Sequence, residues 1–439
     1  VGKMKRVLIA NRGEIALRVH RACKLLELET VAAYTKADKE LLHLDLVDDQ
    51  ICVGQHSYIN TAQLISAAHI SGCDAIHPGY GFLSEDAAFA TSVSNAGLIF
   101  LGPDALHISL MGDKIAARQS LADAGIPTLP GSSQAIADEA ELRLIADRIG
   151  FPVMLKAAHG GGGMGIQLVE DETKLSDTFN ALSRQAESLF GRSEIYLEKY
   201  LVDARHIEIQ VFGDGLGSVV YFGARDCSVQ RRHQKLLEET PPPGISATDV
   251  DALARHCCEV LGFMNYASAG TLEFLYADGQ FYFIEMNTRI QVEHPITESL
   301  CGIDLVGMQL ELAAGRLPPL EQLSINAKGH ALECRINAED GDYKPTPGQI
   351  LDLRFPGGPG VRVDSHLYEG YSVPHQYDSL VAKIITLGSD RDDAIKRMIC
   401  ALNEFSVRGI STNIDLHKKV LSDEAFRAGH HHTGLLSGG

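Results

Sequence analysis

The sequence has no long apolar run, no paired-cysteine motif and no excess of positive charge. No stretch approaches the roughly 18 apolar residues that a membrane-spanning helix needs, and the first residues lack the apolar core of a signal peptide. The formal net charge is −18, which argues against nonspecific binding to nucleic acid or to an anionic membrane surface. An anionic substrate would therefore need a local basic pocket.

Cysteine usage and composition indicate the class of protein. The nine cysteines are scattered, odd in number and without a CxxC pair, so we expect mostly buried, reduced thiols and a cytoplasmic protein. With 45% hydrophobic and 22% charged residues over 439 positions, the chain is predicted to be globular, with two to four domains. We find no internal repeat and no low-complexity segment.

Two common nucleotide-binding motifs are also missing. The first expected strand, residues 6–10, is followed by Asn11-Arg12-Gly13-Glu14 and not by GxGxxG, which argues against a dinucleotide site. No Gly-Lys-Ser/Thr opens a helix, as a P-loop requires. Strand patterns and helical spacing nevertheless alternate over residues 1 to about 110, which predicts a parallel α/β unit.

Two glycine-rich segments could replace the missing motifs. Residues 77–85 lie at the expected carboxyl edge of the parallel sheet, where ligands bind in such folds, although a plain structural loop explains them equally well. Four glycines at 160–163 lie between expected strands at 153–156 and 166–169. They can present backbone N–H groups to phosphate oxygens and move as a flap; the alternative is a flexible hairpin tip. Lys156 on the preceding strand favours the phosphate-binding flap.

Residues 270–295 stand out because few polar residues interrupt two apolar and aromatic runs. The runs flank Asp278-Gly279, which is a strong hairpin signal. Glu273, Glu285 and Asn287 interrupt them, and because an unpaired carboxylate is costly to bury, we expect a cation between these side chains. Their oxygens are hard ligands that suit Mg²⁺. The alternative is a solvated hairpin with a salt-bridged exit.

The register of this hairpin decides whether the carboxylates can share an ion. A two-residue Asp278-Gly279 turn would place Glu273 opposite Ile284 and would point Glu285 to the other face. We therefore predict a three-residue loop with Gly279 at positive φ, which shifts the pairing by one residue and brings both carboxylates onto one face. A bulge along one strand is the alternative.

Further charged residues surround the hairpin in the sequence. Arg289, Gln291 and Glu293 follow it at a spacing of two, which on an extended chain directs them to one face. Upstream, residues 223–237 form the strongest basic cluster of this acidic chain, with Arg225, Arg231, Arg232, His233 and Lys235. The cluster is either a solvated face or an anion pocket.

Taken together, these segments resemble the biotin carboxylase family of the ATP-grasp superfamily over essentially the whole chain. The resemblance is carried by residues 9–16, 77–85, 111–114, the glycine flap, Arg231-Arg-His-Gln-Lys235, Glu285-Met-Asn-Thr-Arg-Ile-Gln-Val-Glu-His-Pro295 and residues 333–339, in this order. It implies an α/β fold, α+β in the C-terminal part. The implied domains are an N-terminal α/β domain over 1–112, a mobile ATP-grasp lid over 128–203 and a C-terminal domain over 204–439.

The resemblance also implies the nucleotide and metal sites. ATP would lie between lid and C-terminal domain, with its phosphates on Lys114, Lys156, Gly161, Gly162 and Gly163. Its adenine edge would meet Glu198, Lys199 and Leu201, with His206, Gln230 and His233 along the nucleotide. Mg²⁺ or Mn²⁺ would bridge the phosphates through Glu273, Glu285 and Asn287, neutralising charge as phosphoryl transfer requires.

The implied reaction uses bicarbonate and biotin. Bicarbonate would be held by Lys235, Arg289, Gln291, Val292 and Glu293. Glu293 would take its proton, and the dianion would attack the γ-phosphate of ATP to give carboxyphosphate, which carboxylates biotin. Arg335 would stabilise the enolate-like oxygen of biotin, and Tyr80 and Asp378 would lie near biotin. The implied catalytic residues are Lys235, Arg289, Glu293 and Arg335.

The sequence departs from the family pattern at four positions. Met164 replaces a basic residue of the flap, and His159 replaces a small one. Leu25 and Pro359 stand where the usual homodimer contact has an acidic and an aromatic residue, so we expect weak or altered self-association. No Ala/Val-Met-Lys-Met biotinylation motif occurs, so the biotin carboxyl carrier is expected to be a separate chain or to lie outside this sequence, with a carboxyltransferase as a further partner.

Two other functions remain open from the residues alone. A different ATP-grasp ligase would share Lys156, the flap and the carboxylates, but would not need Arg335 or the 231–235 cluster in this form. A non-catalytic ATP-binding subunit would not need every metal and bicarbonate residue. Phosphate release with and without bicarbonate and biotin separates the three. The final carboxyl acceptor depends on the transferase, so this sequence does not encode it.

Overall fold

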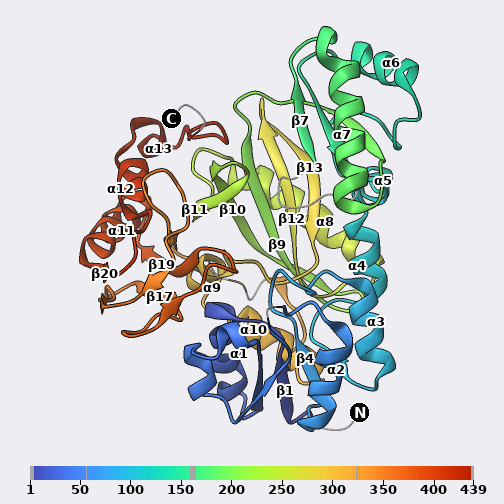
Figure 1. Ribbon diagram of the computed structural model, residues 1–439. Helices are drawn as coiled ribbons and strands as arrows, with labels where there is room; N and C mark the ends of the chain where they lie inside the picture. Colours follow the sequence, from blue (N-terminus) through green and yellow to red (C-terminus); the bar gives the residue numbers. More distant parts are fainter. Residues whose placement is uncertain (1–3, 56, 159–164, 323–324, 326, 437–439) are drawn as a thin grey trace.

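The computed structural model describes the chain except for residues 1–3, 56, 159–164, 323–324, 326 and 437–439. Three larger β-sheets and the helices around them make up the described part (Figure 1). The five-stranded sheet lies at the N-terminal end and the three-stranded sheet at the opposite end of the molecule, with the eight-stranded sheet between them (Figure 1).

The N-terminal part is the parallel α/β unit that the sequence predicts. Its strands have the order β3-β2-β1-β4-β5, and every pair is parallel. The elements are β1 (Arg6–Ile9), α1 (Gly13–Leu25), β2 (Glu29–Tyr34), β3 (Asp49–Cys52), α2 (Thr61–Ile70), β4 (Ala75–His77), α3 (Ala87–Asn95) and β5 (Ile99–Phe100). Val7, Leu8 and Ile9 are fully buried, because helices and neighbouring sheets cover both faces of the central strand.

Two loops meet at the carboxyl edge of this sheet. The Asn11 side chain, just after β1, donates to the carbonyl oxygens of Pro78 at 2.6 Å and of Tyr80 at 2.8 Å. A Cβ at Gly79 would lie 2.7 Å from Asn11 Nδ2, and Gly79 has φ +64°, so only glycine suits this position. The contact fixes Tyr80 next to the start of α1, at the edge where the local sequence is equally consistent with a ligand-binding loop and a structural loop.

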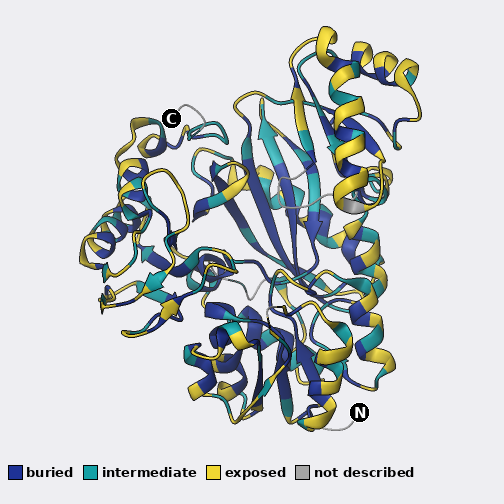
Figure 2. Ribbon diagram, viewed as in Figure 1, coloured by how far each residue is buried: buried dark blue, intermediate teal, exposed yellow. Residues whose placement is uncertain are grey.

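The three-stranded sheet turns one face to an apolar core and carries Lys156 and Glu198 on the other. Its strands are β6 (Val153–Ala157), β7 (Ile166–Val169) and β8 (Ile195–Lys199), in the order β7-β6-β8, and it is accompanied by α6 (Glu139–Ile149) and α7 (Leu175–Phe190). The preceding helices α4 (Ala105–Gly112) and α5 (Lys114–Asp123) pack against the eight-stranded sheet. Leu155 and Leu197 face a core shared with α6 and α7, whose outer sides are exposed (Figure 2). Strand alternation therefore turns Lys156 and Glu198 to the opposite face.

The eight-stranded sheet has the order β13-β12-β9-β10-β11-β14-β19-β17, with antiparallel neighbours throughout. Its strands are β9 (Arg205–Asp214), β10 (Val219–Arg231), β11 (Gln234–Thr240), β12 (Ala267–Ala277), β13 (Gln280–Asn287), β14 (His330–Asn337), β17 (Val361–Ser365) and β19 (Leu380–Gly388). Helices α8 (Ala247–Phe263), α9 (His294–Cys301), α10 (Leu305–Ala313), α11 (Arg391–Glu404), α12 (Ile414–Ser422) and α13 (Glu424–Arg427) pack around it. The short strands β15 (Gly348–Gln349), β16 (Asp352–Arg354), β18 (Ser372–Val373) and β20 (Ser406–Arg408) complete this region.

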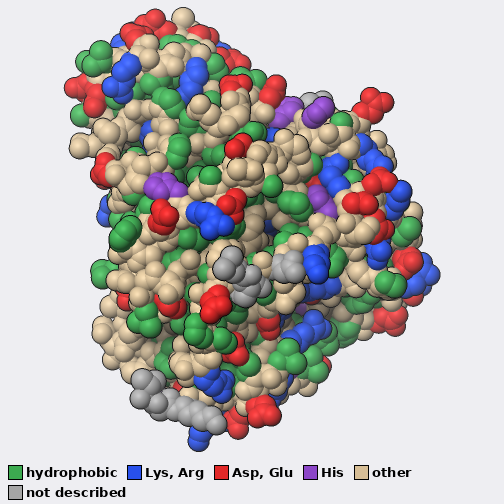
Figure 3. All heavy atoms as spheres, turned by 180° about the vertical axis from the view of Figure 1, so that it is seen from behind, with side chains coloured by type: hydrophobic (Ala, Val, Ile, Leu, Met, Phe, Trp, Pro, Cys, Tyr) green, Lys and Arg blue, Asp and Glu red, His purple; other side chains and the backbone are tan. Residues whose placement is uncertain are grey.

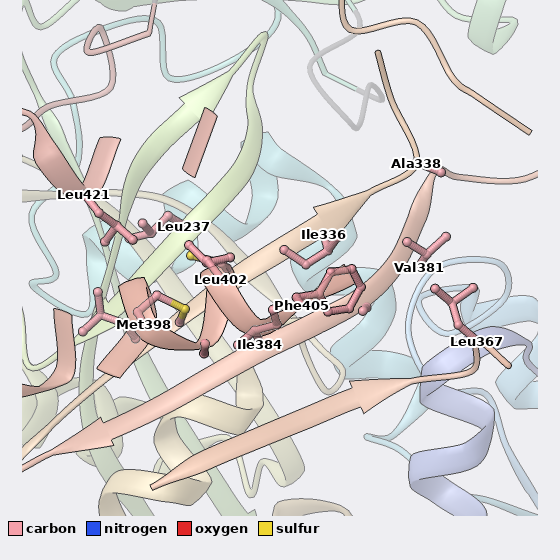
Figure 4. Close-up of a cluster of buried hydrophobic side chains, with 14 of the residues drawn as sticks. Leu237, Ile336, Ala338, Leu367, Val381, Ile384, Met398, Leu402, Phe405 and Leu421 are labelled. Carbon is pink, nitrogen blue, oxygen red and sulfur yellow. The ribbon is translucent and has the colours of Figure 1, made fainter. Parts of the chain in front are cut away.

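The two faces of this sheet differ in character around β14 and β19. On one face Ile336 and Ile384 pack against Met398 and Leu402 of α11 in the largest apolar cluster (Figure 4). Because side chains alternate along a strand, Arg335 projects from the other face. The apolar cluster on one face therefore fixes β14 and β19, and Arg335 lies on the opposite face of the sheet.

The hairpin β12–β13 departs from the predicted loop. It has a two-residue Asp278-Gly279 turn, with Ala277 paired to Gln280, so the three-residue loop was wrong. Both turn residues have positive φ, +50° and +76°, which matches the twist of a tight hairpin. The register instead shifts between Phe274 and Glu273, which leaves Ile284 as an extra residue on β13. This bulge, the alternative from the sequence, pairs Glu273 directly with Glu285.

The surface is mixed in charge. In Figure 3 acidic and basic side chains are interspersed over the face seen from behind. Among the helices in the described part of the chain, none combines the length and the apolar character that a bilayer-spanning segment needs. The nine cysteines are all free thiols.

Candidate active site

A cavity of about 960 Å³ opens where the three sheets approach one another. Its wall includes every sequence-predicted site residue that the structure describes: Tyr80, Lys114, Lys156, Glu198, Lys199, Leu201, His206, Gln230, His233, Lys235, Glu273, Glu285, Asn287, Arg289, Gln291, Val292, Glu293, Arg335 and Asp378. Gly161, Gly162 and Gly163, with His159 and Met164, lie outside the described residues. Residues more than 250 positions apart in the chain thus face one space.

Glu293 lies between two cations in this cavity. Its Oε1 accepts a hydrogen bond from Lys235 Nζ at 2.9 Å, and its Oε2 accepts one from Arg335 Nη2 at 2.9 Å. Burial alone would raise the pKa of Glu293, but Lys235, Arg335 and Arg225 together hold it below its usual range. The carboxylate is therefore ionised, with each oxygen bound to a different cation.

The Lys235 ammonium connects Glu293 to two further carboxylates. It donates to Glu273 Oε1 at 2.9 Å and also to Glu208. Burial opposes the charged ammonium, yet these three carboxylates raise the pKa of Lys235 well above its usual range. Lys235 is thus a permanent positive charge at the centre of an acidic cluster.

Glu273 is held from several sides. Its Oε1 also accepts from Asn287 Nδ2 at 2.7 Å and Gln291 Nε2 at 2.9 Å, and His206 Nε2 lies 2.8 Å from Oε2. Burial would lower the pKa of His206, but the charge of Glu273 and hydrogen bonds to Glu208 and Glu273 together raise it to about 9. The imidazole is therefore cationic at neutral pH. These contacts fix the position of the Glu273 carboxylate.

The residues expected to hold a divalent cation fit that role by their chemistry. Glu273 and Glu285 are opposed on the bulged hairpin and line the cavity with Asn287, so the donors are all oxygens, as Mg²⁺ prefers. Lys114 Nζ donates to Glu285 Oε2 at 2.7 Å and lowers the pKa of that carboxyl group. Both carboxylates are therefore ionised and available as ligands once their ammonium partners are shared with an anion.

Glu273 also belongs to a second cluster of potential metal ligands, whose negative charge is already balanced by a lysine. His206, Glu208 and Glu273 bring three potential ligand atoms within 4.8 Å of one another. The Lys235 ammonium donates to both carboxylates of this group, so it supplies the positive charge that a metal would bring.

Lys156 and Glu198 form an ion pair on the three-stranded sheet. Lys156 Nζ donates to Glu198 Oε2 at 2.6 Å, and Arg118 Nη1 lies 3.5 Å from Glu198 Oε1. Lys199 Nζ donates to the carbonyl oxygens of Gly150 and Phe151, both at 3.0 Å. The Lys156 ammonium thus lines the cavity, as Lys114 and Lys235 also do.

The chain from Arg289 to Glu293 is not the extended strand that its spacing predicted. The sheet pairing ends at Asn287, and Glu293 caps the N-terminus of α9, where Pro295 favours the first helical turn. All three predicted side chains line the cavity even so. Arg289 is fixed by Glu85, with Nε–Oε2 at 2.8 Å, and by Asn287, with Nη2–Oδ1 at 2.7 Å.

The basic cluster at 223–237 has three different environments. Arg225 is fully buried and donates to Glu208 Oε2 through Nε and Nη2, at 3.1 and 3.0 Å. Arg231 donates to Glu339 at 2.7 Å and lies over the Tyr343 ring. Arg232, His233 and Lys235 line the cavity, where Arg232 and His233 are also exposed to solvent, and the anion pocket stays a prediction for this part of the cluster.

Sequence reasoning missed Glu208, the residue that joins Arg225 to Lys235. It is directly opposed to Glu273 on the neighbouring strand β12. The signal was present, since His206 and Glu208 alternate with apolar residues on an expected strand. Its burial depends on a cross-strand partner 65 positions away, which the local pattern does not show.

Tyr80 is connected to the same region through buried charges. Its hydroxyl donates to Glu14 Oε1, which also lies 3.0 Å from Lys383 Nζ. Lys383 in turn donates to the carbonyl oxygen of Val292 at 2.8 Å. Asp378 lines the cavity near the other predicted biotin residues, and its Oδ1 accepts from the Leu380 backbone N–H.

Comparison with known proteins places the chain and its fold in one family. Family models match residues 3–108 (biotin carboxylase, N-terminal domain), 113–322 (carbamoyl-phosphate synthase L chain, ATP binding domain) and 333–438 (biotin carboxylase C-terminal domain). A biotin carboxylase of Pseudomonas aeruginosa is 50% identical over 432 residues, which cover 97% of this chain and 96% of that protein.

Solved structures agree. A biotin carboxylase–nucleotide complex from Campylobacter jejuni superposes with a TM-score of 0.97 at 42% identity, covering 99% of both chains. The biotin carboxylase domain dimer of Hydrogenobacter thermophilus 2-oxoglutarate carboxylase, in complex with MgADP, ADP and bicarbonate, superposes with a TM-score of 0.95 at 40% identity, covering 100% of this chain and 98% of that one. The family and ATP-grasp fold that the sequence predicts are thereby confirmed, and the chain belongs to the biotin carboxylase family.

Proposed function

We propose that the cavity is the site where this chain carboxylates biotin with ATP and bicarbonate, through carboxyphosphate. The observation that carries the proposal is the position of Glu293, bound on one oxygen by Lys235 and on the other by Arg335. Glu293 thereby links Lys235, which is suited to bind bicarbonate, with Arg335, which is suited to bind the biotin oxygen. The nucleotide-facing residues Lys114 and Lys156 line the same cavity.

Glu293 acts as the base that takes the bicarbonate proton. In the structure Lys235 and Arg335 hold its pKa low, which favours the carboxylate but makes it a weak base. When bicarbonate and the biotin oxygen accept hydrogen bonds from these cations, Glu293 loses part of their stabilisation. Its pKa then rises towards that of bicarbonate, and proton transfer becomes favourable. The resulting carbonate attacks the γ-phosphorus of ATP, and ADP leaves.

Lys114 and Lys156 bind the phosphates of ATP. Each is now paired with a carboxylate, Glu285 or Glu198, and each exchanges that partner for a phosphate oxygen. Glu273, Glu285 and Asn287 would hold Mg²⁺, which supplies charge neutralisation for phosphoryl transfer. The similar Hydrogenobacter domain binds MgADP and bicarbonate, in support of this assignment.

The remaining site residues position substrates. Glu198, Lys199 and Leu201 bind the adenine end, with His206, Gln230 and His233 along the nucleotide and the 161–163 glycines over the phosphates. Arg289, Gln291 and Val292 complete the bicarbonate pocket, while Tyr80 and Asp378 lie at the biotin. Carboxyphosphate releases CO₂ and phosphate, the phosphate takes the N–H proton of biotin, and the resulting nitrogen anion attacks CO₂. Arg335 stabilises the negative charge that develops on the ureido oxygen.

We also propose the domain roles and partners. Residues 128–203 act as a lid over the nucleotide, between an N-terminal domain at 1–112 and a C-terminal domain at 204–439. The substrate is biotin on a separate carrier protein, and a carboxyltransferase consumes the product. Leu25 is 77% exposed on α1 and Pro359 is exposed as well, so the surfaces expected at the usual dimer contact are apolar at both points.

Phosphate release tests the proposed function. We expect Mg²⁺-dependent ATP cleavage that requires bicarbonate and is raised by free biotin. Glu293→Gln, which keeps the hydrogen-bond geometry but removes the base, should lower kcat on the order of 100-fold or more with little change in the KM for ATP. An ATPase that ignores bicarbonate would assign the chain to another ATP-grasp reaction, and ATP binding without cleavage would make it a regulatory subunit.

A further inference from the structure

Two buried glutamates without a role in the proposed reaction lie behind Arg335. Glu238 on β11 and Glu333 on β14 are directly opposed across antiparallel strands, so their side chains share one face of the sheet. Both residues have no exposed surface. Arg335 projects from the same face two residues after Glu333, and its Nε donates to Glu238 Oε1 at 2.6 Å.

Little in the surroundings compensates two negative charges at this place. Among the described residues, neither oxygen of Glu333 nor Glu238 Oε2 has a hydrogen-bond partner. Lys383, opposed to Arg335 on β19, is bound to the Val292 carbonyl oxygen at 2.8 Å and to Glu14 at 3.0 Å. Two ionised carboxylates side by side would be strongly destabilised in a buried site that offers so few donors.

The charged groups facing the pair come from several elements. They are Arg335 on β14, Lys235 on β11, Lys383 on β19 and Glu293 at the N-terminus of α9, and the groups that act on Lys383 include Glu14, Asp364 and His294. Burial raises the pKa of Glu333 well above its usual range and the pKa of Glu238 to about 7, although Arg335 opposes both shifts. Charge and geometry agree that one carboxyl group of the pair is neutral.

We propose that Glu238 and Glu333 share one proton, and that Glu238 positions Arg335 for the carboxylation of biotin. The proton leaves one negative charge behind the guanidinium in place of two. Because Arg335 is also bound to Glu293, a second charge on the pair would surround it with three carboxylates and weaken its attraction for the biotin oxygen. The inference rests on the role proposed above for Arg335.

The shared proton can be observed without any activity measurement. Infrared difference spectra of protein labelled with ¹³C-glutamate should show a carboxylic-acid C=O band in the wild type at neutral pH. The band should be missing from Glu333→Gln, whose amide resembles the neutral acid in shape. Raising the pH should remove the wild-type band reversibly. Identical spectra for the wild type and Glu333→Gln in this region would overturn the shared proton.

Kinetics test the positioning role. Glu238→Ala should lower kcat/KM for biotin on the order of 100-fold, since Arg335 loses its anchor, while the KM for ATP stays the same. Glu238→Gln should restore most of this loss, because its amide oxygen still accepts from Arg335 Nε. Glu333→Gln should stay within about twofold of the wild type, because its amide replaces a neutral acid and leaves one negative charge behind Arg335, as in the wild type.

Glu239→Gln is the matched control. Glu239 is equally buried and adjacent in sequence, but it binds His330 at 2.7 Å and Arg391 at 2.6 Å, away from Arg335. Its loss should lower thermal stability and leave kcat/KM for biotin unchanged. If Glu238→Ala and Glu238→Gln each lost ATP affinity and biotin turnover to the same extent, Glu238 would have only a structural role. A wild type without bicarbonate-dependent ATP cleavage would instead refute the proposed function and leave the infrared result standing.

Discussion

Replacing His43 should change how the protein responds to acid. His43 has no exposed surface, and neither ring nitrogen has a hydrogen-bond partner among the described residues. Burial, with help from Arg12 and His20, lowers its pKa to about 3. In the unfolded chain the imidazole returns to a pKa near its ordinary value of about 6.5. Between these two pKa values, His43 is protonated in the unfolded state and neutral in the folded state.

The sign and size follow from this difference. A base with a lowered folded pKa destabilises the protein as pH falls below about 6.5, and the loss continues down to the folded pKa. Between pH 7.5 and pH 5.0 one such histidine removes about 2 kcal/mol of stability. Burial also lowers the pKa of His77 and His417 to about 4 and of His366 to about 3. Four such groups together would cost about 8 kcal/mol at pH 5.0, which is comparable to a whole domain's stability.

His43→Leu tests this reasoning, because leucine fills the site without a titratable group. The variant should take up about one proton fewer than the wild type on unfolding at pH 5.0. The exposed His69→Leu is the control and should leave the uptake unchanged. Residue-specific histidine C2–H exchange, followed by mass spectrometry across pH, reports the folded state directly. A midpoint near 6.5 for His43, or equal proton uptake in both variants, would refute the argument.

Three further predictions concern the site and its surfaces. Arg335→Ala should lower kcat/KM for biotin on the order of 100-fold or more while the KM for ATP stays nearly constant, and equal losses in both would make Arg335 structural. Met164→Arg should lower the KM for ATP, because a guanidinium adds a charge-assisted bond to the polyphosphate; an unchanged or raised KM would show that another group already fills this role. Sedimentation should find weak or altered self-association, whereas a tight dimer paired through Leu25 and Pro359 would contradict this.

Local patterns predicted the elements well because each pattern has a local cause. Asp278-Gly279 predicted a hairpin, since both residues tolerate positive φ, and the structure has a hairpin there. The extra residue at Ile284 had no such cause, because nothing in its side chain distinguishes a bulge from regular pairing. The prediction that Glu273 and Glu285 must share a face required a register shift, and only its place was wrong. The need for two carboxylates on one face thus predicted a register shift that residue propensities could not predict.

The residues that line the cavity were predictable as a set, but the network of contacts among them was not. Lys235, Glu273 and Glu293 were expected, whereas Glu208 and Glu238 were not, although they bind Lys235 and Arg335. Each missed residue lies on a strand whose partner is distant in sequence, and its charge is acceptable only because of that partner. Single-sequence reasoning recognises ligands by their chemistry, but it does not find supporting groups whose role comes from the pairing of strands.

The ion pairs of the cavity couple the binding of its ligands. Lys114 is bound to Glu285 and Lys156 to Glu198, so in the proposed complex each ammonium group must leave its carboxylate before it can bind a phosphate of ATP. A carboxylate left alone in a partly buried site is costly, which lowers the affinity for nucleotide without a cation. A divalent cation on Glu273 and Glu285 would compensate the charge of Glu285 as Lys114 turns to the phosphates, and Arg118 Nη1 already lies 3.5 Å from Glu198 Oε1. Nucleotide and cation should therefore each strengthen the binding of the other, by the same factor, because linkage is reciprocal. The carboxylates of the site therefore make the binding of nucleotide and the binding of the divalent cation depend on each other.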